Sequence, residues 1–388
     1  MSAERMTSRE RVHATARGLP VDRVPVTYWI HPHMACRMMA SHWPGKDRKQ
    51  SRTGKLYWQL FPKRPGFKGG DFWRSLPTLI NGYGNGEYAL ELGADIAFAP
   101  ATGKVVDKTW HEHGRMRIRD AFGSVRGIGG IYADVVEPAI RNIDDLVRYN
   151  MPDPSIEQNY LGIRQLRAAH PEVSIMIETF GVQDFPATQL WKMDQMMLAL
   201  YDHPQEVKAF QQRFSDWAVE TAVRGVRAGA DIVLIYDDYG YTGRPLISMK
   251  MWEEFTYPHL KRLIDAAHEE GALAMLHSCG YQMSFLPHYV KAGLDILQPF
   301  QPKAGNDLAA GVAQVGKDLT FCTGIDIQLG ELMTPEELRQ DILKSYRIGK
   351  QTGRHILGTT HMLQYTMPEE NTRMLFQTVA EIQAGLHD

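Results

Sequence analysis

A short phrase that recurs three times constrains the fold more than any other feature of this chain. A glycine, one further residue and an aspartate occur at residues 93–95, 229–231 and 293–295, and a short apolar run follows each of them at once. A glycine in the left-handed conformation can end a helix at such a point, so that a strand begins directly after it. Apolar runs without alternation are typical of strands that are covered on both faces, as in parallel sheets.

Eight such strands are predicted, with helices between most of them. The strands are residues 24–29, 95–99, 174–178, 231–236, 272–276, 295–298, 319–323 and 355–358. Helices are expected over residues 202–228, 248–270 and 334–353, the last of them opening with a capping box. Eight strands that alternate with helices predict an α/β protein, a (β/α)8 TIM-type barrel rather than an open doubly wound sheet.

Two segments interrupt this alternation. Residues 41–82 are aromatic, basic and rich in Gly and Pro, and we interpret them as an N-terminal excursion after the first strand, either a lid or a packed surface loop. Residues 105–133 alternate as antiparallel strands do and predict a β-hairpin insertion. Because no linker or low-complexity tract divides the chain, residues 1–388 are expected to form a single barrel domain.

Composition and charge argue against several classes of protein. Lys and Arg total 43 and Asp and Glu total 45, so the chain lacks the basic surplus that neutralises a nucleic-acid backbone. The apolar runs are too short to span a membrane, and the charged N-terminus does not resemble a signal peptide. Three cysteines do not make a disulfide framework and suit a reducing compartment. We therefore expect a cytoplasmic enzyme that binds neither nucleic acid nor membrane.

The sharpest chemical feature is a histidine and a cysteine at the end of a predicted strand, where barrel enzymes place their active sites. His277 and Cys279 directly follow residues 272–276, and imidazole with thiolate is a natural zinc pair; the alternative is a buried thiol beside a hydrogen-bonded histidine. A zinc site requires a third protein ligand, and the candidates are Cys322 and His361. Geometry favours His361, which follows the last strand at the same rim, whereas Cys322 lies inside its strand.

Carboxylates at the same rim are the candidates for catalysis. Asp237 and Asp238 follow the fourth predicted strand and can orient a substrate, bind the metal or serve as acid and base; the alternative for either is to cap the next helix. Because side chains alternate, one of the two should face the pocket and the other should accept backbone hydrogen bonds from the loop that follows. Glu178, at the end of the third strand, is a candidate fourth ligand or proton carrier. His31 and His33 are weaker candidates, since a lone histidine near an apolar strand is more often structural.

The sequence resembles the uroporphyrinogen decarboxylase superfamily along nearly its whole length. The resemblance is carried by the opening TSRERVHATARGLPVDRVPV, by a central stretch from YDDYG through PLISMKMWEEFTYPHLKRLIDAAHEEG to LHSCG, and by FCTGIDIQ, LMTPEELRQDI and MPEEN. It implies a barrel. True decarboxylases carry a run such as MRQAGR after the first strand and an aspartate after the second, whereas this chain has WIHPHMACR and Ala99-Pro100. Both differences argue against porphyrinogen decarboxylation.

Within the superfamily, the HSCG segment looks like the zinc motif of the corrinoid-dependent methyltransferases. That motif places a last ligand shortly before a C-terminal Pro-x-x-Asn, and counting back from Pro368 puts His361 there in place of the branch's cysteine, so Cys322 stays the alternative. The resemblance implies a zinc-dependent methyltransferase that moves a methyl group between a small O-methyl, N-methyl or S-methyl substrate and a corrinoid (cobalamin), with demethylation preferred. No D-x-H-x-x-G corrinoid motif is present, so the corrinoid would be free or on a partner protein.

Two other hypotheses stay open at this point. One is a carboxy-lyase, a decarboxylase of the uroporphyrinogen decarboxylase type that acts on another carboxylated substrate through Asp237 or Asp238 without an essential metal. The other is a non-catalytic tetrapyrrole- or corrinoid-binding protein. Metal analysis separates the zinc enzyme from both. A homodimer is common in the superfamily and is expected here on that ground alone.

Overall fold

Eight parallel strands form one sheet that nearly closes into a barrel. The computed structural model describes residues 6–31, 34–35, 38, 86–99, 106–112, 115–128 and 134–387. The strands of the sheet are, in spatial order, β1 (Val26–Thr27), β14 (His355–Thr359), β13 (Thr320–Ile325), β12 (Ile296–Gln298), β11 (Leu273–His277), β8 (Ile232–Tyr236), β7 (Ser174–Phe180) and β2 (Ile96–Ala99). The Asp95 N–H donates to the Val26 carbonyl at 2.7 Å and links the two ends of the sheet. The predicted barrel is therefore confirmed.

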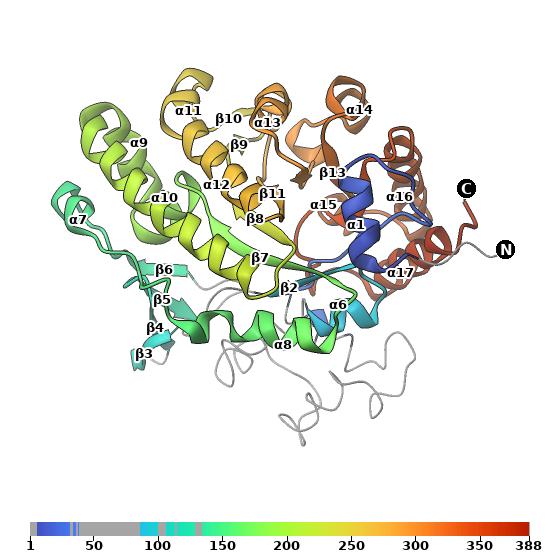
Figure 1. Cartoon of the computed structure of the whole chain (residues 1–388), viewed down its shortest axis with the longest axis horizontal. Helices are drawn as coiled ribbons and strands as arrows, with labels where there is room; N and C mark the ends of the chain where they lie inside the picture. Colours follow the sequence, from blue (N-terminus) through green and yellow to red (C-terminus); the bar gives the residue numbers. More distant parts are fainter. Residues whose placement is uncertain are drawn as a thin grey trace.

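Helices surround the strands, as Figure 1 shows. They are α1 (Ser8–Ala16), α6 (Glu87–Glu91), α7 (Ile143–Arg148), α8 (Leu161–Ala169), α9 (Met193–Asp202), α10 (Pro204–Arg227), α11 (Met249–Phe255), α12 (Tyr257–Glu269), α13 (Leu286–Ala292), α14 (Leu308–Val315), α15 (Ile327–Gly330), α16 (Pro335–Lys350) and α17 (Glu369–Gln383). Among the described residues, no helix is both long and apolar enough to cross a membrane.

One of the three helix predictions was wrong near a proline. The helix expected over residues 202–228 is present as α10, which begins at Pro204, directly after α9 ends at Asp202. The helix expected over residues 248–270 is divided into α11 and α12 at Thr256, two residues before Pro258. A proline has no N–H to donate and disfavours helical geometry in the residue before it. The third helix, α16, begins with the predicted capping box.

The insertion after β2 is larger than the predicted hairpin. It is a four-stranded antiparallel sheet of β3 (Val106–Glu112), β4 (Arg115–Asp120), β5 (Val125–Ile128) and β6 (Asp134–Glu137), so it continues past residue 133. A lone two-stranded ribbon is marginally stable, and two further strands give it a face to pack. The Ser124 hydroxyl donates to the Gln189 carbonyl at 2.7 Å, which anchors the insertion beside the loop after β7. The excursion predicted at residues 41–82 lies outside the described residues.

The recurring glycine–aspartate phrase has a common structure in all three places. Gly93, Gly229 and Gly293 have φ values of 92°, 121° and 82°, as the predicted helix stops require. The aspartate of each phrase then accepts a backbone N–H from the neighbouring strand, at 2.8–2.9 Å. The pairs are Asp95 with Val26, Asp231 with Ile175 and Asp295 with Ala274. The phrase therefore ends a helix and ties its strand to the sheet at the N-terminal end of the barrel.

The N-terminal end of the barrel is closed by α1. Its Val12 and Ala16 belong to the apolar cluster that also holds inward-facing strand residues such as Leu234 and Met275. Arg11 and Arg9 of the same helix pair with Asp95 and Asp231. With this end closed, ligands have access to the barrel interior from the opposite, C-terminal end, where enzymes of this fold place their chemistry.

Candidate metal centre

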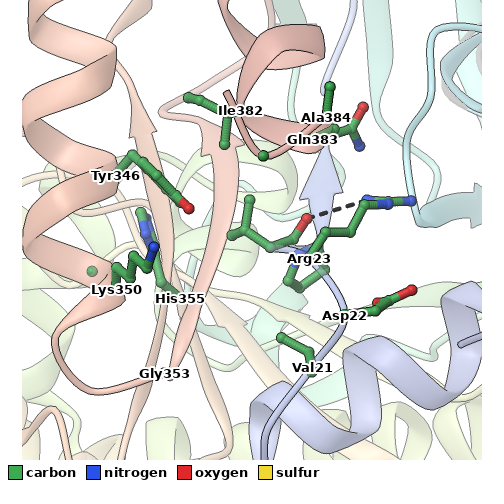
Figure 2. Close-up of a pocket in the computed structure, with 14 residues that line it drawn as sticks. Val21, Asp22, Arg23, Tyr346, Lys350, Gly353, His355, Ile382, Gln383 and Ala384 are labelled. Atoms are coloured by element: carbon green, nitrogen blue, oxygen red, sulfur yellow. Dashed lines mark hydrogen bonds between the residues drawn. The ribbon is translucent and has the colours of Figure 1, made fainter. Parts of the chain in front are cut away.

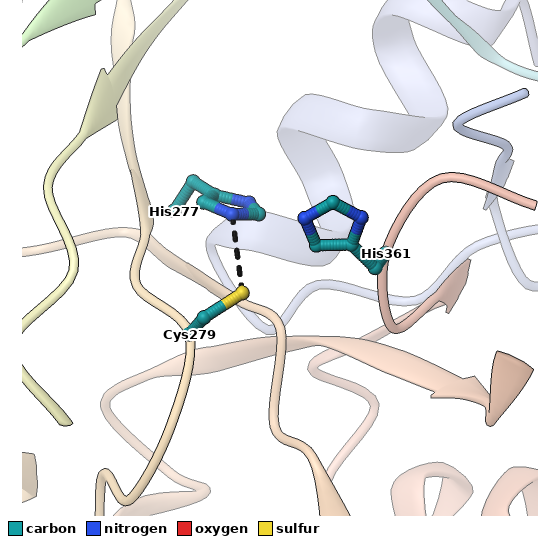
Figure 3. Close-up of side chains that lie close together, drawn as sticks. All are labelled: His277, Cys279 and His361. Carbon is teal, nitrogen blue, oxygen red and sulfur yellow. Dashed lines mark hydrogen bonds between the residues drawn. The ribbon is translucent and has the colours of Figure 1, made fainter. Parts of the chain in front are cut away.

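His277, Cys279 and His361 come together at the C-terminal end of the barrel. His277 is the last residue of β11, Cys279 follows it, and His361 lies two residues beyond the end of β14. One potential ligand atom from each lies within 4.8 Å of the other two, and His277 Nε2 is 3.5 Å from Cys279 Sγ (Figure 3). Ligands at about 2.05 and 2.3 Å from a tetrahedral zinc ion would lie about 3.6 Å apart. The spacing of His277 and Cys279 therefore matches one zinc ion, and His361 lies close enough to complete a candidate site.

The imidazole of His277 is held on three sides. Its ring is stacked between Trp29 and Tyr236, each with centroids 4.6 Å away and with interplanar angles of 13° and 8°. Its Nδ1 faces the side-chain oxygen of Gln298. Burial lowers the pKa of His277 to about 4, with the Gln298 hydrogen bond opposing that shift. The ring is therefore neutral at pH 7, the form that binds a metal.

The other two members of the group are also uncharged in the absence of a metal. Burial lowers the pKa of His361 to about 4, and nearby His277 adds to the effect while Asp238 opposes it. Burial raises the pKa of the Cys279 thiol well above its usual range, and the charges of Asp238 and Asp184 raise it further. A thiolate at this position therefore needs a cation beside it, which a divalent metal supplies.

Close contact between two loops fixes the position of Cys279. Gly280 has a φ of 83°, and a Cβ there would overlap the carbonyl group of Gly240, the first residue of the short strand β9 (Gly240–Tyr241) after β8. The Cys279 N–H donates to the Asp238 carboxylate at 2.7 Å, and the Gly280 N–H donates to the Gln301 side chain at 2.9 Å. Glycine at both positions lets the backbones meet, so the thiol is set by main-chain packing.

Asp237 and Asp238 diverge, as alternation along the strand predicts. The Asp237 carboxylate is fully buried and accepts the N–H groups of Gln183 and Asp184, at 3.1 and 2.6 Å for its Oδ1. These donors follow β7, whereas the expected donors lay in the loop after Asp237 itself. A Cβ at Gly181 would overlap the Asp237 carboxylate, so glycine is required there. Asp238 instead lies 4.0 Å from His277 Nε2, beside the three candidate ligands.

Two more carboxyl groups lie at this end of the barrel. Glu178 is inside β7, which continues to Phe180, and burial raises the pKa of Glu178 to about 7. Burial and the charges of Asp238 and Asp237 raise the pKa of Asp184 to about 8. Burial also raises the pKa of Asp237 to about 7. These groups hold or exchange protons near neutral pH.

Sequence reasoning missed Asp184 and Gln298. Asp184 follows β7 and Gln298 ends β12, and this position at a strand end is the signal that could have found them. Neither residue forms part of a recognisable motif. Cys322 lies in β13 and is completely buried in the apolar cluster of the barrel, apart from the three grouped side chains. His31 is buried beside the ring of Tyr365 and lies outside the group. His33 lies outside the described residues.

A cavity of about 280 Å³ lies at the opposite end of the barrel (Figure 2). It is bounded by the residues before β1 and by the C-terminal ends of α16 and α17. Two of its charged side chains are held in ion pairs, Arg23 with Asp95 and Asp22 with Arg11, at 2.8 and 2.6 Å. This cavity is remote from the grouped histidines and cysteine and is not the candidate site.

A family model for uroporphyrinogen decarboxylase (URO-D) matches residues 116–382, more than half of the chain. The chain belongs to this family. No curated protein matches it. Among solved structures, a methyltransferase from Methanosarcina mazei is similar with a TM-score of 0.67 and 16% identity, over 97% of this chain and 99% of that one. A B12-independent methionine synthase from Shewanella sp. W3-18-1 gives a TM-score of 0.47 and 12% identity, over 82% and 90%. The similarity to the Methanosarcina mazei protein shows a shared fold.

Proposed function

We propose that this URO-D family member is a zinc-dependent methyltransferase that moves a methyl group between a small O-methyl, N-methyl or S-methyl substrate and a corrinoid, in the direction of demethylation. The observation that carries the proposal is the convergence of His277, Cys279 and His361 within 4.8 Å at the C-terminal end of the barrel. The methyltransferase among the similar structures supports methyl transfer as the reaction type.

The donor set suits a catalytic zinc site. Two neutral imidazoles and a thiolate are zinc ligands, and three protein ligands leave a fourth position for a substrate, as catalytic zinc sites do. A zinc ion bound here would act as a Lewis acid on the heteroatom that carries the methyl group, or would hold a thiol acceptor as its thiolate. The stacked Trp29 and Tyr236 rings keep His277 in place and exclude water from two of its faces.

The carboxyl groups of the site supply proton chemistry. Asp238 lies against the three ligands, with its carboxylate held by the Cys279 N–H. Burial raises the pKa of Glu178 to about 7, so this group keeps a proton near neutral pH. It can pass that proton to the substrate heteroatom from which the methyl group is removed. Asp237 holds the loop after β7 through the N–H groups of Gln183 and Asp184. We assign Asp238 and Glu178 to proton transfer and Asp237 to support of the loop.

The methyl acceptor is proposed to be a corrinoid on a partner protein or free in solution. A methyl ether yields its methyl group only to a strong nucleophile. Among the described residues, the two cysteines do not serve: Cys279 belongs to the metal group and Cys322 is buried. A reduced corrinoid supplies such a nucleophile, and it would have to enter at the open end of the barrel. A homodimer and a cytoplasmic location stay predictions from the sequence.

The carboxy-lyase is the second candidate, and family membership favours it. A carboxylated substrate needs a cation to receive it. In the part of the chain that the structure describes, no Arg or Lys is paired with the carboxyl groups of the site, and their pKa values are raised. Such surroundings offer an anionic substrate no cationic side chain to pair with, so the methyltransferase is the better supported proposal.

The test is metal analysis of the purified full chain together with an activity assay. We expect about one zinc per chain, lost in His277→Ala and retained in His288→Ala, a partly exposed histidine paired with Glu253. Demethylation should require a Co(I) corrinoid in addition to zinc. Metal-free protein with full activity would refute the zinc enzyme. Demethylation without a corrinoid, thiol or folate would refute the corrinoid step even if zinc is bound.

A further inference from the structure

Gln298 lies between two parts of the candidate metal centre. It is the last residue of β12, is 2% exposed, and is the register partner of His277 in the parallel β11–β12 pair. Its side-chain oxygen faces Nδ1 of His277, and its side-chain nitrogen donates to the Thr359 carbonyl at 3.2 Å. Thr359 ends β14, two residues before His361. One buried amide therefore contacts His277 and the strand that leads to His361.

The hydrogen-bonding capacity of these groups leaves one consistent arrangement. A backbone carbonyl can only accept, so the amide nitrogen of Gln298 must face Thr359 and its oxygen must face His277. That oxygen can only accept as well, so Nδ1 of the neutral His277 ring must carry the proton. The lone pair of His277 is then on Nε2, the atom 3.5 Å from Cys279 Sγ.

We infer that Gln298 is a positioning residue that fixes His277 in the Nδ1–H tautomer and so presents its Nε2 to a metal ion. The metal part of this inference rests on the proposed function. Stacking between Trp29 and Tyr236 sets the plane of the His277 ring, and the Gln298 hydrogen bond sets its rotation within that plane. Outer partners of this kind commonly change metal affinity by 10- to 100-fold when they are removed.

The same contacts connect the ligands to one another. The backbone N–H of Trp29 donates to the Thr359 hydroxyl at 3.0 Å, while the Gln298 side chain donates to the Thr359 carbonyl. Trp29 also meets the His361 ring edge-on, with centroids 6.2 Å apart. Orientation of His277 and placement of the strand before His361 therefore depend on the same few groups. Substitution of Gln298 should therefore affect both the orientation of His277 and the position of His361.

The test compares three variants of the full chain. Gln298→Met keeps the volume and removes both hydrogen bonds, whereas Gln298→Glu, as a neutral acid, can accept from His277 and donate to Thr359. Gln211→Met is the control, because Gln211 is an equally buried glutamine on α10 without a contact to the site. The first measurement is ¹⁵N NMR of histidine-labelled, metal-stripped protein, with His277→Ala to assign the signals. The second is Zn²⁺ affinity by competition with a chelator.

We expect the Nδ1–H tautomer at His277 in the wild type and in Gln298→Glu, and its loss in Gln298→Met. Zinc should bind Gln298→Met about 10- to 100-fold more weakly than the wild type, and Gln298→Glu should recover at least tenfold of that loss. Gln211→Met should match the wild type in both measurements.

An Nε2–H tautomer in the wild type, or a Gln298→Met variant with unchanged tautomer and zinc affinity, would overturn the inference. A wild-type protein that binds no zinc and yet shows the Nδ1–H tautomer would refute the proposed zinc enzyme and support the tautomer assignment. The two failures are therefore distinguishable.

Discussion

The two ends of the barrel bury carboxyl groups in opposite surroundings. At the N-terminal end, Asp95 is completely buried and pairs with Arg11 and Arg23 at 2.7 and 2.8 Å. At the C-terminal end lie four carboxyl groups without such partners: Glu178, Asp184, Asp237 and Asp238. Within the described ranges, none of these four is paired with an arginine or a lysine. The first arrangement is stabilising, whereas burial without a cationic partner costs free energy of folding, which at Asp237 the two accepted backbone N–H groups offset.

The comparison separates structural from functional use of the same residue type. Asp95 accepts a backbone N–H from the neighbouring strand and neutralises the arginine of α1, the helix that closes this end. The carboxyl groups without a cationic partner adjoin the candidate metal centre, and burial raises their pKa values. Titratable groups with strongly shifted pKa values are common at active sites, where their protonation serves catalysis although their burial lowers stability. We therefore propose the C-terminal end as the functional end, and the following predictions test that contrast.

The largest effect is expected from Asp95→Asn. The substitution removes the carboxylate that pairs with Arg23 and Arg11, of which Arg11 keeps Asp22, and breaking a buried pair from one side costs about 3–5 kcal/mol. Urea denaturation of the purified, metal-free protein measures that loss, and the zinc content of the folded protein should not change. If Asp95→Asn fails to fold, Arg23→Met, which keeps the Arg11 pair, gives a smaller and measurable loss. A loss below about 1 kcal/mol would contradict a stabilising role for this network.

Next in size is the difference between Asp237→Ala and Asp238→Ala. The first removes the acceptor of two buried N–H groups and should lower the free energy of unfolding by about 2–4 kcal/mol. The second leaves only the Cys279 N–H without its acceptor, so its stability should stay closer to that of the wild type. Asp238→Ala should instead lower methyl transfer by about 10²- to 10⁴-fold. Equal losses of activity in two equally stable variants would contradict the division of roles.

A smaller effect is expected from pH at Asp184. Its pKa rises from 3.8 to about 8 in the folded protein, so the folded state binds the proton more tightly than the unfolded chain between these values. Stability should therefore be highest near the lower value and fall as the pH rises toward 8. Relative to the wild type, Asp184→Asn should gain at least about 1 kcal/mol between pH 5 and pH 8. If the difference in the free energy of unfolding between Asp184→Asn and the wild type does not change with pH, the surroundings of Asp184 do not raise its pKa.

The smallest effect is expected at the rim of the N-terminal end. His268 contacts Asp295 at 2.7 Å, but the two side chains are 39% and 22% exposed. Solvent screens such a pair, so His268→Ala should cost less than about 1 kcal/mol and leave the zinc content unchanged. Thermal denaturation at low and high salt measures the loss. A loss as large as that of Asp95→Asn would mean that burial does not decide the strength of these pairs.

Sequence reasoning predicted the barrel because its evidence is local. Each strand is a short apolar run bounded by a helix stop, and the glycines of the repeated phrase have the positive φ values that this interpretation requires. The placement of His277, Cys279 and His361 at one rim follows from strand direction alone, since parallel strands end on the same side. The prediction of one helix over residues 248–270 missed the break at Thr256, because an apolar pattern continues across the residues before Pro258, where the backbone does not stay helical.

By itself, then, the sequence determined the strands, their direction and the end of the barrel at which polar groups collect. The tertiary structure decided which of those groups meet. Arg11 pairs with Asp95 across 84 residues, and Gln298 contacts both His277 and Thr359. These pairings depend on strand order and on the side of the strand that each side chain occupies. The charge balance that distinguishes the two ends of the barrel follows from those contacts. The sequence alone does not show which buried carboxylate has a cationic partner and which does not.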